Sequence, residues 1–175
     1  MVHYRRQRIA GARVFFTHVA HDRDARLLYE HIDLLRGAYT AVSARWPFAT
    51  RAIVVLPDHL HCIWQLPEHD ADSAGRWRLI KARFSAALRL RGVNVGTRRA
   101  GGCCVWQRRY WEHTLRNDDD LRTHVDYIHV NPLKHGLVQR VRDWPHSSFH
   151  RAVARGELAD DWGGEIAPPQ GRYGE

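Results

Sequence analysis

The chain has 175 residues, enough to bury the core of a single domain. It carries 27 Lys and Arg against 19 Asp and Glu, a formal charge of +8, which favours a polyanionic partner such as nucleic acid over a protein that merely happens to be basic. No stretch approaches the roughly 18 apolar residues of a membrane span, the N-terminus has no apolar signal-peptide core, and the three cysteines form no CxxC pair. We therefore expect a protein with reduced cysteines and no membrane segment.

The first half of the chain predicts a strand, a helix and a hairpin. Residues 13–20 are rich in β-branched and aromatic side chains, as strands are. Apolar residues recur at helical spacing over residues 24–46. Strands are predicted at 51–56 and 59–66, joined by a tight turn at Pro57-Asp58.

The second half predicts more helix and one further strand. An amphipathic helix is expected over 75–91, followed by a Gly- and Arg-rich loop over 92–102 and a short fourth strand over 103–107. Acidic residues open a helix over 118–130, and we expect Pro132 to stop it. A short helix should begin near Ser147. We predict a catalytic domain over 1–155 and a flexible tail over 156–175.

The order of these elements is β-α-β-β-α-β with additional C-terminal helices. This order predicts the α+β class and the ferredoxin-like, split β-α-β arrangement, an antiparallel sheet with helices on one face. The other face is then expected to be open for binding or chemistry.

The stretch VVLPDHLHCIWQLP places two histidines on one side of the third predicted strand. Since residues i and i+2 share a strand face, His59 and His61 point one way, while Leu60, Cys62, Trp64 and Leu66 point toward the helices. Two neutral imidazoles side by side can share a divalent metal. The chain has 13 histidines, so chance alone also produces such a pair.

The stretch THVDYIHVNPLKHGLV places Tyr127 and Asn131 on one helix face. The phenol of Tyr127 can attack a phosphodiester if a metal takes up charge from the leaving oxygen. The amide oxygen of Asn131 can complete a metal shell. Both residues also have ordinary interpretations, as a packed aromatic residue and as a helix stop.

Basic residues cluster near the N-terminus, on the second helix and in WQRRYWEH, where they alternate with aromatic residues. Basic groups follow phosphates and aromatic rings stack on unpaired bases. A solvated helix face beside core tryptophans would show the same pattern. The residues that we predict to contact DNA are Arg5, Arg6, Arg76, Arg78, Lys81, Arg83, Trp106, Arg108 and Arg109.

Several longer stretches resemble one family. VVLPDHLHCIW, RWRLIKARF, WQRRYWEHTLRNDDDL, HVDYIHVNPLKHGLV and DWPHSSFH resemble motifs of the REP-associated tyrosine transposases, in the Y1 superfamily of the IS200/IS605 type. The resemblance spans residues 4–155. It implies a ferredoxin-like fold with a His-hydrophobic-His metal motif, matched by His59 and His61, and a nucleophile matched by Tyr127. The wider superfamily has a Gln as third ligand one turn after the tyrosine, where this chain has the shorter Asn131.

The resemblance implies an enzyme that cleaves and rejoins single-stranded DNA at REP-type hairpins with Mg²⁺ or Mn²⁺, through a 5′-phosphotyrosine. It implies a cytoplasmic, nucleoid-associated bacterial protein, either a monomer with its own tyrosine in the site or a homodimer that exchanges tyrosines. The alternative is a non-catalytic DNA- or RNA-binding module on a ferredoxin-like scaffold, which would place aromatic residues on the open sheet face.

Overall fold

The computed structural model describes residues 8–96, 104–163 and 173–174 of the chain. The elements, in chain order, are β1 (Arg13–Val19), α1 (Leu27–Glu30), α2 (Ile32–Arg45), β2 (Ala49–Val55), β3 (His59–Gln65), α3 (Ser73–Leu90), β4 (Trp111–Thr114), α4 (Asp118–Lys134), the 3-10 helix η1 (Val141–Asp143) and α5 (Phe149–Ala154). No helix in these ranges is both long and apolar enough to cross a membrane.

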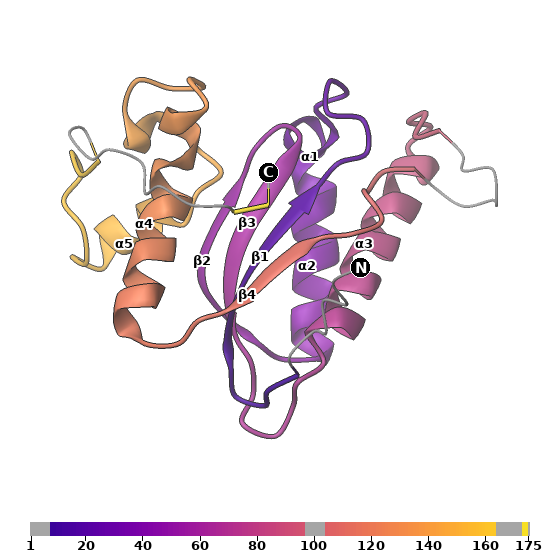
Figure 1. Ribbon diagram of the computed structural model, residues 1–175. Helices are drawn as coiled ribbons and strands as arrows, with labels where there is room; N and C mark the ends of the chain where they lie inside the picture. Colours follow the sequence, from indigo (N-terminus) through magenta and orange to yellow (C-terminus); the bar gives the residue numbers. More distant parts are fainter. Residues whose placement is uncertain (1–7, 97–103, 164–172, 175) are drawn as a thin grey trace, which may run out of the picture.

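The strands form one antiparallel sheet in the order β2-β3-β1-β4 (Figure 1). β3 lies between β2 and β1, as the split β-α-β pattern requires, which confirms the predicted ferredoxin-like α+β fold. The register pairs Thr17 of β1 with His61 of β3, in the centre of the sheet.

Helices α2 and α3 cover one face of the sheet (Figure 1). Leu60, Cys62 and Trp64 of β3 are buried in the core on this face, as their alternation predicted. The ring of Trp64 stacks on Trp77 of α3, with centroids 4.5 Å apart and ring planes 8° from parallel. This core fixes the direction in which the opposite residues of β3 point.

The prediction of an open second face is wrong, because α4 packs on it (Figure 1). Phe15 and Ile63 from the sheet are fully buried there with Tyr127 and Ile128 of α4. The sequence order placed α4 after the sheet motif but did not reveal which surface its apolar side would cover. The histidine pair therefore lies under a helix and not on an exposed sheet surface.

Two predicted elements have other boundaries than expected. The fourth strand is Trp111–Thr114 and not residues 103–107. Within the predicted range, residue 103 lies outside the described residues, and Trp106 forms a single bridge with Ala20. β1 pairs instead with residues 111–114 over most of its length. The helix expected over 24–46 is broken at His31, where the backbone is not helical.

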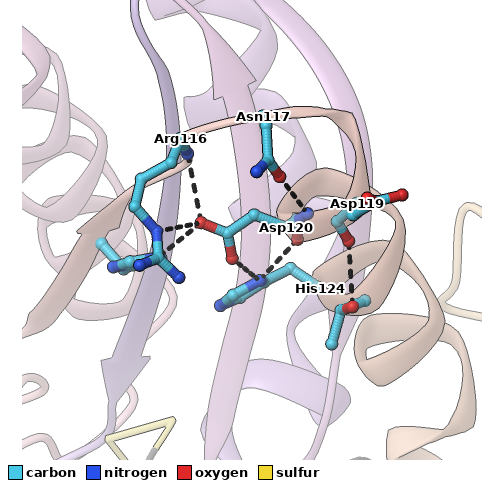
Figure 2. Close-up of polar contacts among 7 residues, drawn as sticks. Arg116, Asn117, Asp119, Asp120 and His124 are labelled. Carbon is cyan, nitrogen blue, oxygen red and sulfur yellow. Dashed lines mark hydrogen bonds and ion pairs between the residues drawn. The ribbon is translucent and has the colours of Figure 1, made fainter.

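Helix α4 begins at a strong cap and a charged network (Figure 2). The side chain of Asn117 accepts a hydrogen bond from the backbone N–H of Asp120 at 2.8 Å. The Asp120 carboxylate in turn contacts Nε of Arg116 at 3.2 Å and Nδ1 of His124 at 3.2 Å. These contacts fix the first two turns of α4 against the end of β4.

The helix does not stop at Pro132 as predicted but continues through Lys134. Proline lacks one backbone donor, yet its φ suits a helix, so only one hydrogen bond is lost. The end comes at Gly136, with φ +66°, where the N–H of Leu137 bonds to the carbonyl of Pro132 and that of Gly136 to Leu133. The extra turn brings Lys134 onto the helix face of Tyr127, seven residues earlier.

Candidate active site

The histidine pair lies at the start of β3, on the face that α4 covers. His59 is 1% exposed and His61 is fully buried, and their ring centroids are 4.9 Å apart. Burial, followed by the charges of His59 and Lys134, holds the pKa of His61 well below its usual value. His61 is therefore a neutral imidazole, the form that binds a metal.

A polar group holds the Nδ1 atom of each ring. Asp58 lies 2.7 Å from Nδ1 of His59, and the hydroxyl of Thr17 lies 2.8 Å from Nδ1 of His61. The Thr17 hydroxyl donates to the carbonyl of Tyr173, so it accepts the hydrogen from His61. In both rings the lone pair is then on Nε2.

The residues fit a metal ion at this place. Nε2 of His59 is buried and has no hydrogen-bond partner among the described residues. A buried nitrogen without a partner is unfavourable, and coordination of a cation would satisfy it. Asn131 is fully buried on α4, one turn after Tyr127, where an amide oxygen can join such a site.

Tyr127 of α4 reaches the histidine pair within the same chain. Its ring centroid is 5.2 Å from that of His61. Lys134 donates a hydrogen bond from Nζ to the Tyr127 hydroxyl at 3.0 Å. An ammonium group at this distance favours the phenolate form of a tyrosine, which is the nucleophilic form.

Two further aromatic groups border the site. Tyr173, near the C-terminus, stacks on Tyr127 with centroids 3.6 Å apart and leaves Tyr127 with no exposed surface. His135, which follows α4, lies 5.0 Å from His59 between ring centroids. Burial and the charge of His59 lower the pKa of His135 to about 4, so this ring is also neutral near pH 7.

A second group of residues that could hold a metal lies farther toward the start of α4 (Figure 2). Within the described part of the chain it comprises His113, Asp120 and His124, whose ligand atoms lie within 4.8 Å of one another. Nε2 of His113 is 3.0 Å from the Asp120 carboxylate. Arg116 already neutralises that carboxylate, so the group is stable as a hydrogen-bond network.

Some of the predicted DNA contacts gather in one basic cleft, a cavity of about 750 Å³ beside α3. Arg78, Lys81 and Arg108 line it together with Trp106, and Lys81 lies 5.1 Å from the Trp106 ring centroid. The cleft also includes Arg8 and Arg89. Five basic residues face one acid, Asp72, in this lining.

The other predicted contacts lie elsewhere. Arg76 is 3% exposed, and its guanidinium bonds to the carbonyls of Trp46, Pro47 and Asp72 and to the Asp70 carboxylate. It therefore ties α3 to the loop before β2. Arg83 lines a separate groove between α2 and α3, and Arg109 is exposed outside the basic cleft. Arg5 and Arg6 lie outside the described residues.

Five residues that contact the site were not predicted from the sequence: Thr17, Asp58, Lys134, His135 and Tyr173. His135 is one of 13 histidines, and no pattern distinguished it from the others. Asp58 had a signal, because it directly precedes His59, but it was interpreted as a turn residue. Lys134 was missed because the helix was expected to stop two residues earlier. Thr17 and Tyr173 are distant in sequence, and no local pattern points to them.

A ferredoxin-like sheet whose buried histidine pair meets a helical tyrosine matches the arrangement that the resemblance to tyrosine transposases implies, and comparisons with known proteins agree. A REP-associated tyrosine transposase of Escherichia coli is 46% identical over 95% of this chain and 93% of its own length. A Haemophilus influenzae protein with the same family designation is 44% identical over 94% of each chain. The chain therefore belongs to the REP-associated tyrosine transposases.

A solved structure leads to the same family. The structure of a REP-associated tyrosine transposase bound to a REP hairpin superposes with a TM-score of 0.87 at 44% identity, covering 100% of this chain and 98% of the other. No family model matches the sequence. The likeness extends over the whole fold, including the helix that carries Tyr127.

Proposed function

We propose that this protein cleaves and rejoins single-stranded DNA at REP-type hairpins through a covalent 5′-phosphotyrosine on Tyr127. The observation that carries the proposal is that the exposed Lys134 side chain and the buried rings of Tyr127 and His61 meet at one place. The solved relative that is bound to a REP hairpin supports the choice of substrate. A phenol that attacks a phosphodiester develops negative charge on its oxygen, and the Lys134 ammonium group is placed to stabilise that charge.

Nε2 of His59 and of His61 would hold Mg²⁺ or Mn²⁺, with the amide oxygen of Asn131 as third ligand. A divalent ion there supplies Lewis-acid polarisation of the scissile phosphate and offsets charge on the leaving 3′ oxygen. Asp58 and Thr17 hold the Nδ1 atoms of the two rings, which leaves the Nε2 atoms as the ones that would bind the ion.

The chemical step follows from the Tyr127 environment. The phenol gives up its proton to solvent, its oxygen attacks phosphorus, and the bond from phosphorus to the 3′ oxygen breaks. That oxygen takes a proton and leaves as a free 3′-hydroxyl. Lys134 stabilises the negative charge on the phenol oxygen before attack, and again when a 3′-hydroxyl displaces the tyrosine in the joining reaction.

The hairpin is proposed to bind in the basic cleft, through Arg78, Lys81 and Arg108, with Arg8 and Arg89 added. Arg83 and Arg109, which lie outside the cleft, remain proposed contacts, as do Arg5 and Arg6, which are not among the described residues. Trp106 is 5% exposed and contacts the Lys81 ammonium group through its ring. Arg76 is left out, because its guanidinium is committed to the protein. Two consecutive residues of β1, which point to opposite faces of the sheet, connect the cleft to the site: His18 packs on Trp77, and Thr17 bonds to His61.

The alternative of a non-catalytic module on this scaffold is less consistent with the fold. Such a module would stack bases on an exposed sheet face. Here α2 and α3 cover one face, and α4 covers the other.

We also propose that one chain completes its own site, as a monomer in the bacterial cytoplasm at the nucleoid where its DNA substrate lies. A mixture of His59→Ala and Tyr127→Phe proteins tests this point. If the tyrosine acts within its own chain, the mixture stays inactive. Restored cleavage would show exchange of tyrosines in a dimer.

The function itself is tested by incubating the protein with a REP-type hairpin and Mn²⁺ and resolving the products on a denaturing gel. The proposal predicts a protein–DNA adduct and a free 3′ end, both lost with EDTA and in Tyr127→Phe. A His59→Ala,His61→Ala protein should bind the hairpin but form no adduct. Adduct formation by Tyr127→Phe would refute the assignment.

A further inference from the structure

The carboxylate of Asp58 connects two parts of the chain beside the active site. One oxygen lies 2.7 Å from Nδ1 of His59, and the other lies 2.5 Å from Nε of Arg23. Asp58 belongs to the turn between β2 and β3, and Arg23 to the loop after β1. The backbone carbonyl of Asp58 also accepts a hydrogen bond from Ala20 at 2.7 Å, which holds the turn in place independently of the side chain.

The charge of Asp58 decides which nitrogen of His59 carries the hydrogen. Each oxygen of the carboxylate has its own nitrogen partner, Nε of Arg23 for one and Nδ1 of His59 for the other, an arrangement that suits an ionised Asp58. An ionised carboxylate only accepts hydrogen bonds, so the hydrogen of His59 lies on Nδ1. The lone pair then lies on Nε2, the buried atom that has no hydrogen-bond partner among the described residues.

The two histidines differ in the group that contacts the Nδ1 atom of each ring. His59 has a carboxylate, whereas His61 has the neutral hydroxyl of Thr17. A negative partner on one imidazole nitrogen increases the electron density at the other and fixes the ring orientation, and removing such a partner typically weakens metal binding about 10- to 100-fold.

We propose that Asp58, oriented by Arg23, is a positioning residue that makes His59 the stronger of the two metal-ligating histidines. The inference rests on the proposed function, because it assigns a supporting group to the proposed metal site. Arg23 is half-exposed and acts on His59 only indirectly, because it contacts the Asp58 carboxylate and not the imidazole.

The test is a Mn²⁺ titration of the DNA-free protein, followed by the EPR signal of free Mn²⁺. Asp58→Asn keeps the side-chain shape but removes the charge, and we expect the Mn²⁺ dissociation constant to rise about 10- to 100-fold. Thr17→Val should raise it less. Asp24→Asn is the matched control, because Asp24 lines the same cavity as Asp58, and it should change the constant less than about two-fold.

Two further measurements separate positioning from folding. The melting temperature and hairpin affinity of Asp58→Asn should match those of the wild type, since Asn retains the backbone hydrogen bond to Ala20. The inference is overturned if Asp58→Asn binds Mn²⁺ as tightly as the wild type, or if Thr17→Val lowers the Mn²⁺ affinity more than Asp58→Asn does. In either case, loss of Mn²⁺ binding in His59→Ala would still support the proposed metal site. Mn²⁺ binding unaffected by His59→Ala would refute the metal site and this inference with it.

Discussion

At the scale of single residues, the Tyr127 hydroxyl depends on Lys134 for its polar environment. The 3.0 Å hydrogen bond comes from a side chain whose own pKa is lowered by burial. Lys134 also lies 4.9 Å from the Tyr127 ring centroid, so the ammonium group stays close when the hydroxyl turns toward a phosphate. We expect Lys134 to stabilise the reaction most strongly when negative charge develops on the Tyr127 oxygen.

Replacing Lys134 by Gln should slow adduct formation about 100-fold, the typical effect of removing one donor to a developing negative charge. Hairpin affinity should stay near the wild-type value. Single-turnover kinetics at saturating DNA measure the first quantity, and a binding isotherm measures the second.

Lys81→Gln is the matched control, because Lys81 lines the basic cleft on α3, whereas Tyr127 lies on α4 at the opposite face of the sheet. It should weaken hairpin binding and leave the single-turnover rate at saturation unchanged. The account of Lys134 fails if both variants lose affinity and rate in the same proportion.

The sequence predicted the residues that a local pattern marks. Alternation in a strand placed His59 and His61 on one face, whereas helical spacing alone also allowed a packed aromatic residue at Tyr127, and the family resemblance indicated its proposed role. The support for these residues was not predictable in the same way. Thr17 and Tyr173 are 156 residues apart and share a hydrogen bond only because the chain folds back over β1.

At the scale of elements, α4 is joined to the edge of the sheet through one serine. The Ser148 hydroxyl lies 3.0 Å from Nε2 of His129 on α4 and accepts a hydrogen bond from the backbone N–H of Ile53 on β2 at 2.9 Å. Ser148 also begins the segment that leads into α5. The edge strand β2 is thus covered, and α4 is held over the histidine pair.

This contact predicts a pH dependence of stability. Burial, and then the charge of Arg151, lowers the pKa of His129 to about 4 from the usual 6.5 of a histidine. Between these values the unfolded chain binds a proton that the folded chain does not, so the free energy of unfolding should fall as the pH drops from 6.5 to 4. The contribution of His129 is at most about 3 kcal/mol.

Urea denaturation at a series of pH values measures this effect. A His129→Gln variant should lose less stability than the wild type over the same interval, because it has one fewer group to protonate. Equal pH dependence in the two proteins would show that His129 is not the group responsible.

The elements themselves were predicted in type and order, with errors where local and tertiary effects compete. Pro132 is a helix breaker by propensity, yet the helix continues because the following residues find their hydrogen bonds and Gly136 supplies the left-handed end. The fourth strand was misplaced because an apolar pair, Val105 and Trp106, is buried without belonging to the sheet.

At the scale of the whole molecule, Tyr173, which is distant in sequence, stacks on Tyr127, the proposed nucleophile. The stacked ring of Tyr173 must move before a phosphate can reach Tyr127. Tyr173→Ala should therefore speed adduct formation under single-turnover conditions, with the hairpin affinity unchanged. A rate equal to or below that of the wild type would show that the stacked ring does not limit access.

The same geometry raises the question of which tyrosine becomes attached to DNA, since the two rings lie 3.6 Å apart. Tandem mass spectrometry of the adduct, after digestion with trypsin and nuclease, answers it most directly. The tryptic peptide of residues 123–134 contains Tyr127 as its sole tyrosine. The account predicts a nucleotide joined through its 5′-phosphate to Tyr127, whereas the same nucleotide on Tyr173 would contradict it.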